Sequence, residues 1–146
     1  EIRLSLVGSE MCIRDRVKGA QAIALAIYRA KHDSITKNQI WYVLDNYYPE
    51  YTEKTLDEIR PGYHFDSTCQ GSVPIALLAF LESEDYEDCL KLAISMGGDS
   101  DTIAAMAGSI AYAYYEKMPQ TIFDQVWDVL PEEMIDIIET FDDVCE

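Results

Sequence analysis

The stretch YEDCLKLAISMGGDSDTIAAMAGSIAYAYY, residues 86–115, decides the fold of this chain. Apolar residues recur at helical spacing on both sides of the Gly97–Gly98 pair, which predicts two helices joined by a sharp turn. Asp85 is a suitable cap for the first helix. The expected core stripes are Tyr86, Leu90, Ala93, Ile94 and Met96 in the first helix, and Ile103, Ala107, Ile110, Ala111 and Tyr114 in the second. Ala104 and Gly108 should let a neighbouring helix approach the second helix closely.

Helical spacing continues upstream. A helix is predicted from Val17 to about Lys31, with a core stripe of Ala20, Ile23, Ala24 and Ile27. Thr36 and Gln39 have the spacing of a capping box at the start of the next helix, which should end at Pro49. Its expected core stripe is Ile40, Val43, Leu44 and Tyr47.

The rest of the chain is helical or irregular, without a β-hairpin signal. Pro74 suits the first turn of a helix that is nearly all apolar up to Leu81, so we expect this helix to be buried on most sides. The other expected helices span residues 55–60, 120–130 and 131–141, and residues 49–71 form a turn-rich connector. A chain of 146 residues has the size of one domain. The sequence therefore predicts a compact, multi-helix, all-α domain.

The N-terminal residues differ in character from this body. Residues 5–16, SLVGSEMCIRDR, resemble the translated sequencing-adapter peptide that contaminates some assembled genes. Residues 1–16 hold three basic and three acidic side chains, so the whole formal charge of -16 belongs to residues 17–146. We expect residues 1–16 to be a non-native, disordered leader and residues 17–146 to be a partial domain; a native irregular leader is the alternative.

The acidic composition excludes several classes of partner. A charge of -16 repels phosphate backbones and anionic lipid surfaces, so we expect neither nucleic-acid nor membrane binding. The uncharged run from Thr102 to Tyr115 is well short of the roughly 20 residues that a membrane-spanning helix needs. The four cysteines form no CxxC pair and the two histidines form no HExxH motif, which argues against zinc. Scattered cysteines and the lack of a secretory pattern favour a cytoplasmic location; the oligomeric state is not readable.

The string GGDSDT, residues 97–102, carries the chemistry. Two glycines permit a positive φ, so the chain can turn sharply and bring the carboxylates of Asp99 and Asp101 toward one point. Thr102 adds a hydroxyl group, and a set of oxygen ligands favours Mg²⁺, Mn²⁺ or Ca²⁺. The competing interpretation is simple helix capping, because Asp, Ser and Thr are also the preferred residues at a helix N-terminus.

Three stretches together resemble the C-terminal half of the ADP-ribosylglycohydrolase family: VKGAQAIALAIYRAK, GYHFDSTCQGSVPIALLAFLES and residues 86–115. The resemblance implies an all-α domain with two Mg²⁺ ions, or Mn²⁺ in their place, that cleaves the glycosidic bond of ADP-ribose in modified proteins or small molecules. It carries over Asp99, Asp101 and Thr102 as metal ligands, and Asp99 and Asp101 as catalytic carboxylates. Gly97, Gly98 and Ser100 would shape the turn and contact substrate, and residues 67–71 are a weaker candidate for the ribose pocket.

The family's upstream Thr/Ser-Asp-Asp motif does not precede Val17 in this sequence. Three oxygens from one loop cannot hold two ions in fixed geometry, so we expect this chain alone to be inactive and its parent to be the hydrolase. Two other readings stay open: a non-catalytic module that binds ADP-ribose or a divalent metal, and an acidic helical interaction protein in which GGDSDT is only a cap.

Overall fold

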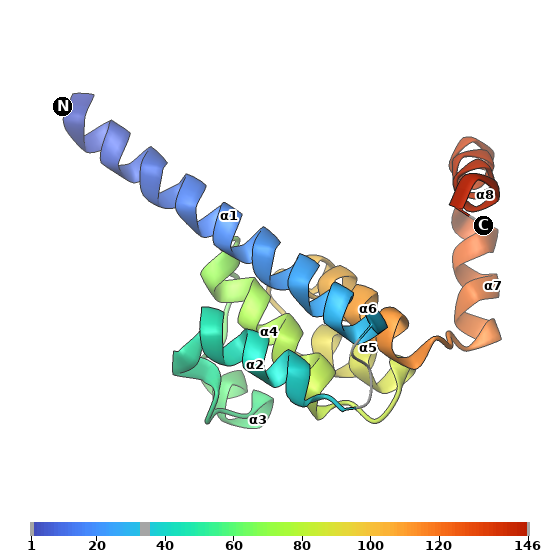
Figure 1. Cartoon of the computed structure of the whole chain (residues 1–146), viewed down its shortest axis with the longest axis horizontal. Coiled ribbons are helices and arrows are strands. Elements are labelled where there is room, and N and C mark those ends of the chain that lie inside the picture. Colours follow the sequence, from blue (N-terminus) through green and yellow to red (C-terminus); the bar gives the residue numbers. More distant parts are fainter. Residues whose placement is uncertain (1, 33–35, 146) are drawn as a thin grey trace.

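The computed structural model describes residues 2–32 and 36–145, and the side chains of residues 13–32 and 36–144. These residues form helices and two short 3₁₀ turns, with no strand among them, which confirms the all-α fold (Figure 1). The α-helices are α1 (Ile2–His32), α2 (Asn38–Tyr47), α3 (Leu56–Ile59), α4 (Cys69–Glu82), α5 (Tyr86–Ser95), α6 (Ser100–Tyr115), α7 (Gln120–Val129) and α8 (Glu132–Cys145). The 3₁₀ turns are η1 (Pro49–Tyr51) and η2 (Arg60–Gly62). No described helix has both the length and the apolar character needed to cross a membrane.

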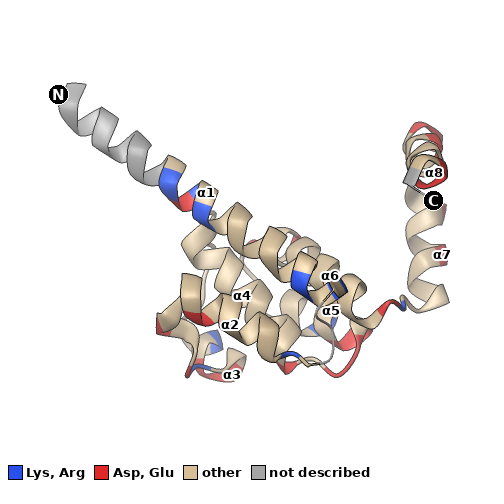
Figure 2. Ribbon diagram, in the orientation of Figure 1, with Lys and Arg blue, Asp and Glu red and all other residues tan. Residues whose placement is uncertain are grey.

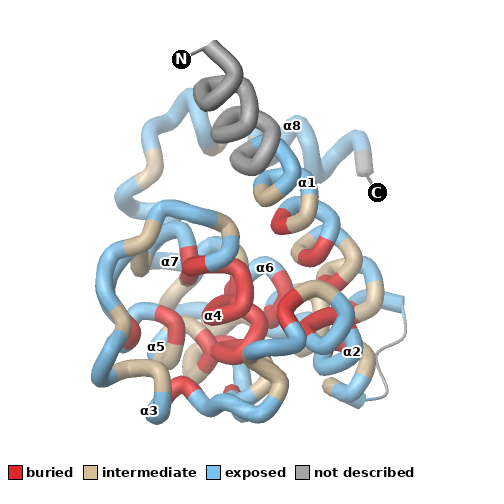
Figure 3. Tube along the Cα trace, turned by 90° about the vertical axis from the view of Figure 1, so that its left-hand side faces the viewer, coloured by how far each residue is buried: buried red, intermediate tan, exposed pale blue. Residues whose placement is uncertain are grey.

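Helix α4 is the centre of the molecule. All ten residues from Gly71 to Phe80 are buried, as expected for a helix that is apolar on every side (Figure 3). The helix begins earlier than the sequence suggested, so Pro74 lies inside it rather than in its first turn. The reason is a polar start at Thr68, whose hydroxyl oxygen accepts a hydrogen bond from the backbone N–H of Gly71 at 3.1 Å.

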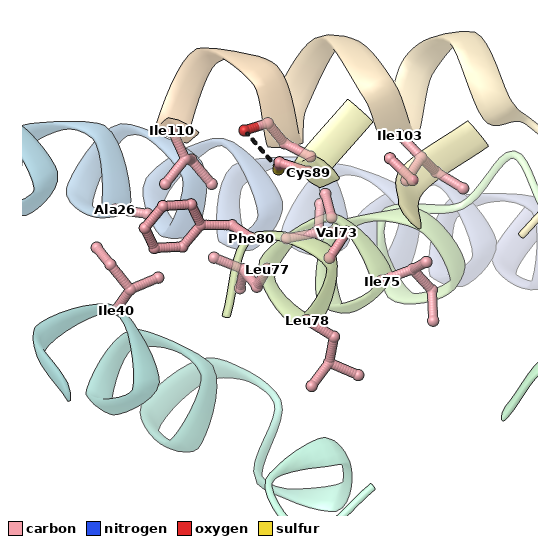
Figure 4. Packing of buried hydrophobic residues seen from close by; sticks show 14 of the residues in the cluster. Ala26, Ile40, Val73, Ile75, Leu77, Leu78, Phe80, Cys89, Ile103 and Ile110 are labelled. Atoms are coloured by element: carbon pink, nitrogen blue, oxygen red, sulfur yellow. Dashed lines mark hydrogen bonds between the residues drawn. The ribbon is translucent and has the colours of Figure 1, made fainter. Parts of the chain in front are cut away.

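The core around α4 is built from α1, α2, α5 and α6. Figure 4 shows Phe80 among Ala26 of α1, Ile40 of α2 and Ile110 of α6, all of which are buried. The Cys89 thiol donates to the carbonyl oxygen of Ala107 at 3.6 Å, and burial raises its pKa to about 11. Cys89 is therefore an inert packing residue, as its place in an apolar helix predicted.

The expected core stripes are confirmed in α2 and α6 and corrected elsewhere. Ile40, Val43 and Leu44 are buried in α2, and Ile103, Ala107, Ile110 and Ala111 in α6. Gly108 does allow a close approach, because a Cβ built there would lie 3.0 Å from Cδ2 of Leu90. In α5, however, Ile94 is 57% exposed. The buried residues of this helix are Tyr86, Cys89 and Ala93, so the stripe includes Cys89, which was not in the predicted stripe, and excludes Ile94.

Helix α1 differs most from its prediction. It begins at Ile2 rather than near Val17, so residues 2–16 are helical where we expected disorder. Once a helix is nucleated, each added residue costs little, and no Gly or Pro interrupts residues 9–18. The buried face is formed by Ala22, Ala26 and Ala30, whereas Ala20 and Ala24 are exposed. The predicted stripe and the observed buried face are both apolar. The observed face consists of alanines, whose small side chains let α1 lie close to its neighbours.

The loop before α2 also departs from the expected cap. Helix α2 begins at Asn38 after Lys37, without a side-chain capping bond, so the proposed Thr36–Gln39 box is wrong. The Lys37 ammonium is used elsewhere: Nζ donates to the carbonyl oxygens of Phe80 at 2.8 Å, of Leu81 at 3.3 Å and of Ser83. Lys37 thus caps the carboxyl end of α4 and ties the start of α2 to it.

Helices α7 and α8 extend away from this body (Figure 1). They lie close to their predicted ranges, although α8 runs on to Cys145. No residue from Gln120 to Val144 is buried. The charged positions of both helices are all acidic, and Figure 2 shows them as red bands on a largely tan ribbon. The apolar faces of both helices are therefore at most partly buried in the part of the chain that the structure describes.

Candidate metal centre

The turn between α5 and α6 has the backbone that the sequence predicted. Gly97 and Gly98 adopt φ values of 72° and 64°, in the left-handed region that favours glycine. The turn places Asp99 directly before α6 and Ser100 as its first residue. Asp99 and Ser100 are partly exposed and Asp101 and Thr102 are exposed, so all four side chains are accessible from solvent.

The side chain of Asp99 does not cap the helix. Although Asp99 occupies the N-cap position, its side chain makes no capping hydrogen bond with the backbone of α6. Its Oδ1 atom instead accepts a hydrogen bond from the hydroxyl group of Thr102 at 3.0 Å. For Asp99 the simple capping interpretation is therefore wrong, and two of the three predicted ligand groups are in direct contact.

Asp101 is held in its charged form. The backbone N–H of Thr102 donates to Oδ1 of Asp101 at 2.9 Å. This bond to the charged carboxylate holds the pKa of Asp101 below its ordinary value. Asp99, Asp101 and Thr102 thus form one cluster of oxygen atoms in a single helical turn.

The chemistry of these donors fits a hard cation. Carboxylate and hydroxyl oxygens are the ligands that Mg²⁺ and Mn²⁺ take in proteins, with water filling the remaining positions. In the described ranges, however, no three His, Cys, Asp or Glu side chains come together in a way that could hold a metal ion. The turn therefore supplies two carboxylates and one hydroxyl, which is part of a coordination shell.

A second loop, residues 62–68, lies against this turn. A Cβ atom built on Gly98 would lie 3.0 Å from Cε1 of Tyr63 and 3.3 Å from the Cα atom of Phe65. Burial raises the pKa of Tyr63, and the carboxylates of Asp66 and Asp99 raise it further. Sequence reasoning missed Tyr63 and Phe65 as neighbours of the turn, because only the fold brings residues more than 30 positions apart together.

Residues 67–71, the weaker candidate for a ribose pocket, have local structural roles. Thr68 caps α4, and Gly71 is buried under Asp66, whose carboxylate leaves no room for a Cβ atom on Gly71. A hollow of about 890 Å³ lies nearby, between η1 and η2. Tyr63 lines it, but residues 67–71 and 97–102 do not.

Comparison with known families matches residues 7–145 to ADP-ribosylglycohydrolase. The chain belongs to the ADP-ribosylglycohydrolase family. Among its relatives, ADP-ribosylarginine hydrolase Tri1 of Serratia proteamaculans is 39% identical over 67 residues, which are 45% of this chain and 17% of that protein. ADP-ribosylhydrolase ARH3 of Bos taurus is 41% identical over 63 residues, 34% of this chain and 17% of the relative. No solved structure gives a significant match.

Family membership confirms the resemblance that the three sequence stretches indicated. The matched segment nevertheless spans only about a sixth of the length of these curated relatives, at 17%. The fold and the family are thus established for this chain, whereas its reaction, substrate and bound ions are matters for a proposal.

Proposed function

We propose that this chain provides the Asp-Ser-Asp-Thr part of a divalent-metal site for hydrolysis of the glycosidic bond of ADP-ribose. Asp99, Asp101 and Thr102 are the proposed ligands of Mg²⁺, or of Mn²⁺ in its place. One observation carries the proposal: the Asp99 carboxylate makes no capping hydrogen bond with the backbone of α6. It accepts a hydrogen bond from the Thr102 hydroxyl group instead, so two of the proposed ligands lie together. Family membership supports the same assignment.

Each residue of the turn has a role in this proposal. A bound divalent ion would supply Lewis-acid polarisation and a more acidic water molecule. Asp101, whose pKa is lowered, stays ionised at neutral pH and can hold the ion or accept a proton. Asp99 is the second carboxylate that can hold the ion or accept a proton. Gly97 and Gly98 place the backbone close to substrate. The Ser100 N–H at the start of α6 can donate to a phosphate oxygen or a ribose hydroxyl oxygen of ADP-ribose.

The proposed substrate is an ADP-ribosylated protein or small molecule. The Serratia relative is named for ADP-ribosylarginine, which makes an arginine-linked substrate the natural first choice. Two ions, as implied by the family, need more ligands than the two carboxylates and one hydroxyl of this turn. We therefore propose that the 146-residue chain binds an ion weakly and does not turn over substrate alone.

The test begins with ion binding, because it does not depend on turnover. Millimolar Mg²⁺ should raise the melting temperature if the dissociation constant is submillimolar, because the stabilisation grows with the ratio of ion concentration to that constant and reaches about 2.7 kcal/mol at a hundredfold excess. Asp101→Asn should abolish the rise, whereas Asp128→Asn, which removes one exposed charge from α7, should keep it. An equal response of the chain and of Asp101→Asn would place the ion elsewhere and refute the proposed site.

Turnover is tested separately with an ADP-ribosylated arginine substrate, in Mg²⁺ and in chelator. We expect no release of ADP-ribose by the chain alone. The alternative function, a non-catalytic module, is favoured by the small ligand set of the turn. It predicts Mg²⁺-dependent binding of free ADP-ribose. Chelator-sensitive hydrolysis by the 146-residue chain would contradict both the incomplete-shell argument and the binding module.

A further inference from the structure

The glycine pair is the most deformable part of the proposed metal site. Gly97 and Gly98 both have a positive φ and are exposed, and a Cβ built on Gly97 would meet nothing within 4 Å. Glycine has more conformational freedom than any other residue. Asp99 lies outside α6 and joins the glycine pair to the helix that holds Asp101. If the turn were unsupported, the backbone of Asp99 could shift relative to Asp101, and an ion would have to order it on binding.

Contacts from the loop after α3 restrict this freedom on two sides. On one side, the ring of Tyr63 lies against Gly98, 3.0 Å from the position of a built Cβ. On the other side, Nη1 of Arg60 donates to the carbonyl oxygen of Ser95 at 2.6 Å and to its hydroxyl oxygen at 2.8 Å. Ser95 is the last residue of α5, so Arg60 fixes the backbone where it enters the glycine pair.

Tyr63 is itself anchored to the rigid centre of the molecule. Its hydroxyl group donates to the carbonyl oxygen of Gly71 at 3.2 Å, and Gly71 lies in the first turn of the buried helix α4. A ring held at its hydroxyl end by α4 and packed at its edge against Gly98 connects the core to the turn. Asp99 influences this ring electrostatically, which places the carboxylate of the proposed site near it.

We infer that Tyr63 is a positioning residue that holds the Gly97–Gly98 turn in place and thereby sets the affinity of Asp99 and Asp101 for a divalent ion. This inference rests on the proposed function. Tyr63 acts through the backbone of Gly98 and needs no contact with the ion. Residues that orient ligands in this way typically change metal affinity by about 10–100-fold when they are replaced.

The experiment measures Mn²⁺ affinity of the 146-residue chain from the signal of free Mn²⁺ in electron paramagnetic resonance. Tyr63→Ala should weaken binding about tenfold, because both the ring and its anchor are lost. Tyr63→Phe keeps the ring against Gly98 but loses the bond to Gly71, so its affinity should lie between those of Tyr63→Ala and the unaltered chain. Val43→Ala, a cavity in the distant helix α2, controls for a general loss of stability and should leave the affinity unchanged.

The variants separate failure of this inference from failure of the proposed function. If Asp101→Asn abolishes Mn²⁺ binding while Tyr63→Ala binds as tightly as the unaltered chain, the positioning role is wrong and the metal site stands. If Val43→Ala weakens binding as much as Tyr63→Ala, the effect is one of overall stability and the inference fails. If Asp101→Asn binds Mn²⁺ normally, the proposed site itself is refuted.

Discussion

Helices α4 and α8 each contain 14 residues, and both are rich in apolar side chains, yet they have opposite surroundings. In α4 all residues from Gly71 to Phe80 are buried. In α8 no residue from Glu132 to Val144 is buried, and Phe141 is 65% exposed. Apolar content alone therefore does not decide where a helix lies.

The arrangement of the apolar residues explains the difference. They lie on every side of α4, so only a position between several other helices removes them from water. In α8 they alternate at helical spacing with six carboxylates, Glu132, Glu133, Asp136, Glu139, Asp142 and Asp143. A helix of this kind can bury one face at most, and in the described part of the chain no residue of that face is fully buried.

The largest expected effect comes from a matched pair of phenylalanine truncations. Phe80→Ala should lower the free energy of unfolding by about 3–5 kcal/mol, because it opens a cavity in the core. Phe141→Ala should change it by less than about 0.5 kcal/mol, as for other exposed positions. Urea denaturation followed by circular dichroism measures both values. Equal losses would mean that α8 is packed as tightly as α4.

A second prediction concerns the carboxyl end of α4. Lys37→Met should lower the free energy of unfolding by about 2 kcal/mol, because the carbonyl oxygens of Phe80 and Leu81 lose a charged donor. Lys31→Met, at an exposed position in the last turn of α1, is the control and should have little effect. The same urea titration applies. If both variants unfold alike, the contacts of Lys37 contribute nothing measurable to stability.

Much of the fold could be predicted because helical periodicity is a local property. The stripes of α2 and α6 and the glycine turn each depend on residues a few positions apart. The buried face of α1 could not be predicted in this way, because Ala22 and Ala24 are equally apolar and the choice between their faces depends on distant helices. The start of α4 was missed for a related reason, since Pro74 suggested a first turn that Thr68 actually begins.

In the candidate site, too, contacts between residues close in the sequence could be predicted, and contacts between distant residues could not. Asp99, Asp101 and Thr102 follow one another in the sequence, so their proximity could be predicted from the turn alone. Tyr63 and Arg60 lie more than 30 residues upstream of the turn. Their contacts with Gly98 and Ser95 depend on how the connector folds back over α5, and no local pattern encodes that path.

A third prediction uses glycine to test how closely α1 approaches α4. A Cβ atom on Gly19 would lie 2.8 Å from Cβ of Cys69 and 2.9 Å from its sulfur atom. Gly19→Ala should therefore cost about 1–2 kcal/mol through overpacking, despite the higher helix propensity of alanine. Gly62→Ala, where nothing lies within 4 Å, is the control. A stabilised Gly19→Ala variant would show that α1 can move away from α4 freely.

The smallest expected effect concerns acid stability at the start of α4. Oδ1 of Asp66 accepts the backbone N–H of Thr68 at 2.8 Å, and this bond, followed by one from the Thr68 side chain, lowers the pKa of Asp66 below its ordinary value of 3.8. A carboxyl group whose pKa is lowered by folding stabilises the native state fully above its unfolded pKa, and this contribution is lost as the pH falls through the folded pKa. Asp66 is only partly buried and its carboxylate is screened by solvent, so the effect should be below about 1 kcal/mol. We expect Asp66→Asn to flatten the fall in melting temperature below pH 4, whereas Asp128→Asn in α7 should leave that fall unchanged. Identical acid limbs for Asp66→Asn and the unaltered chain would mean that the Thr68 contact does not favour the ionised carboxylate.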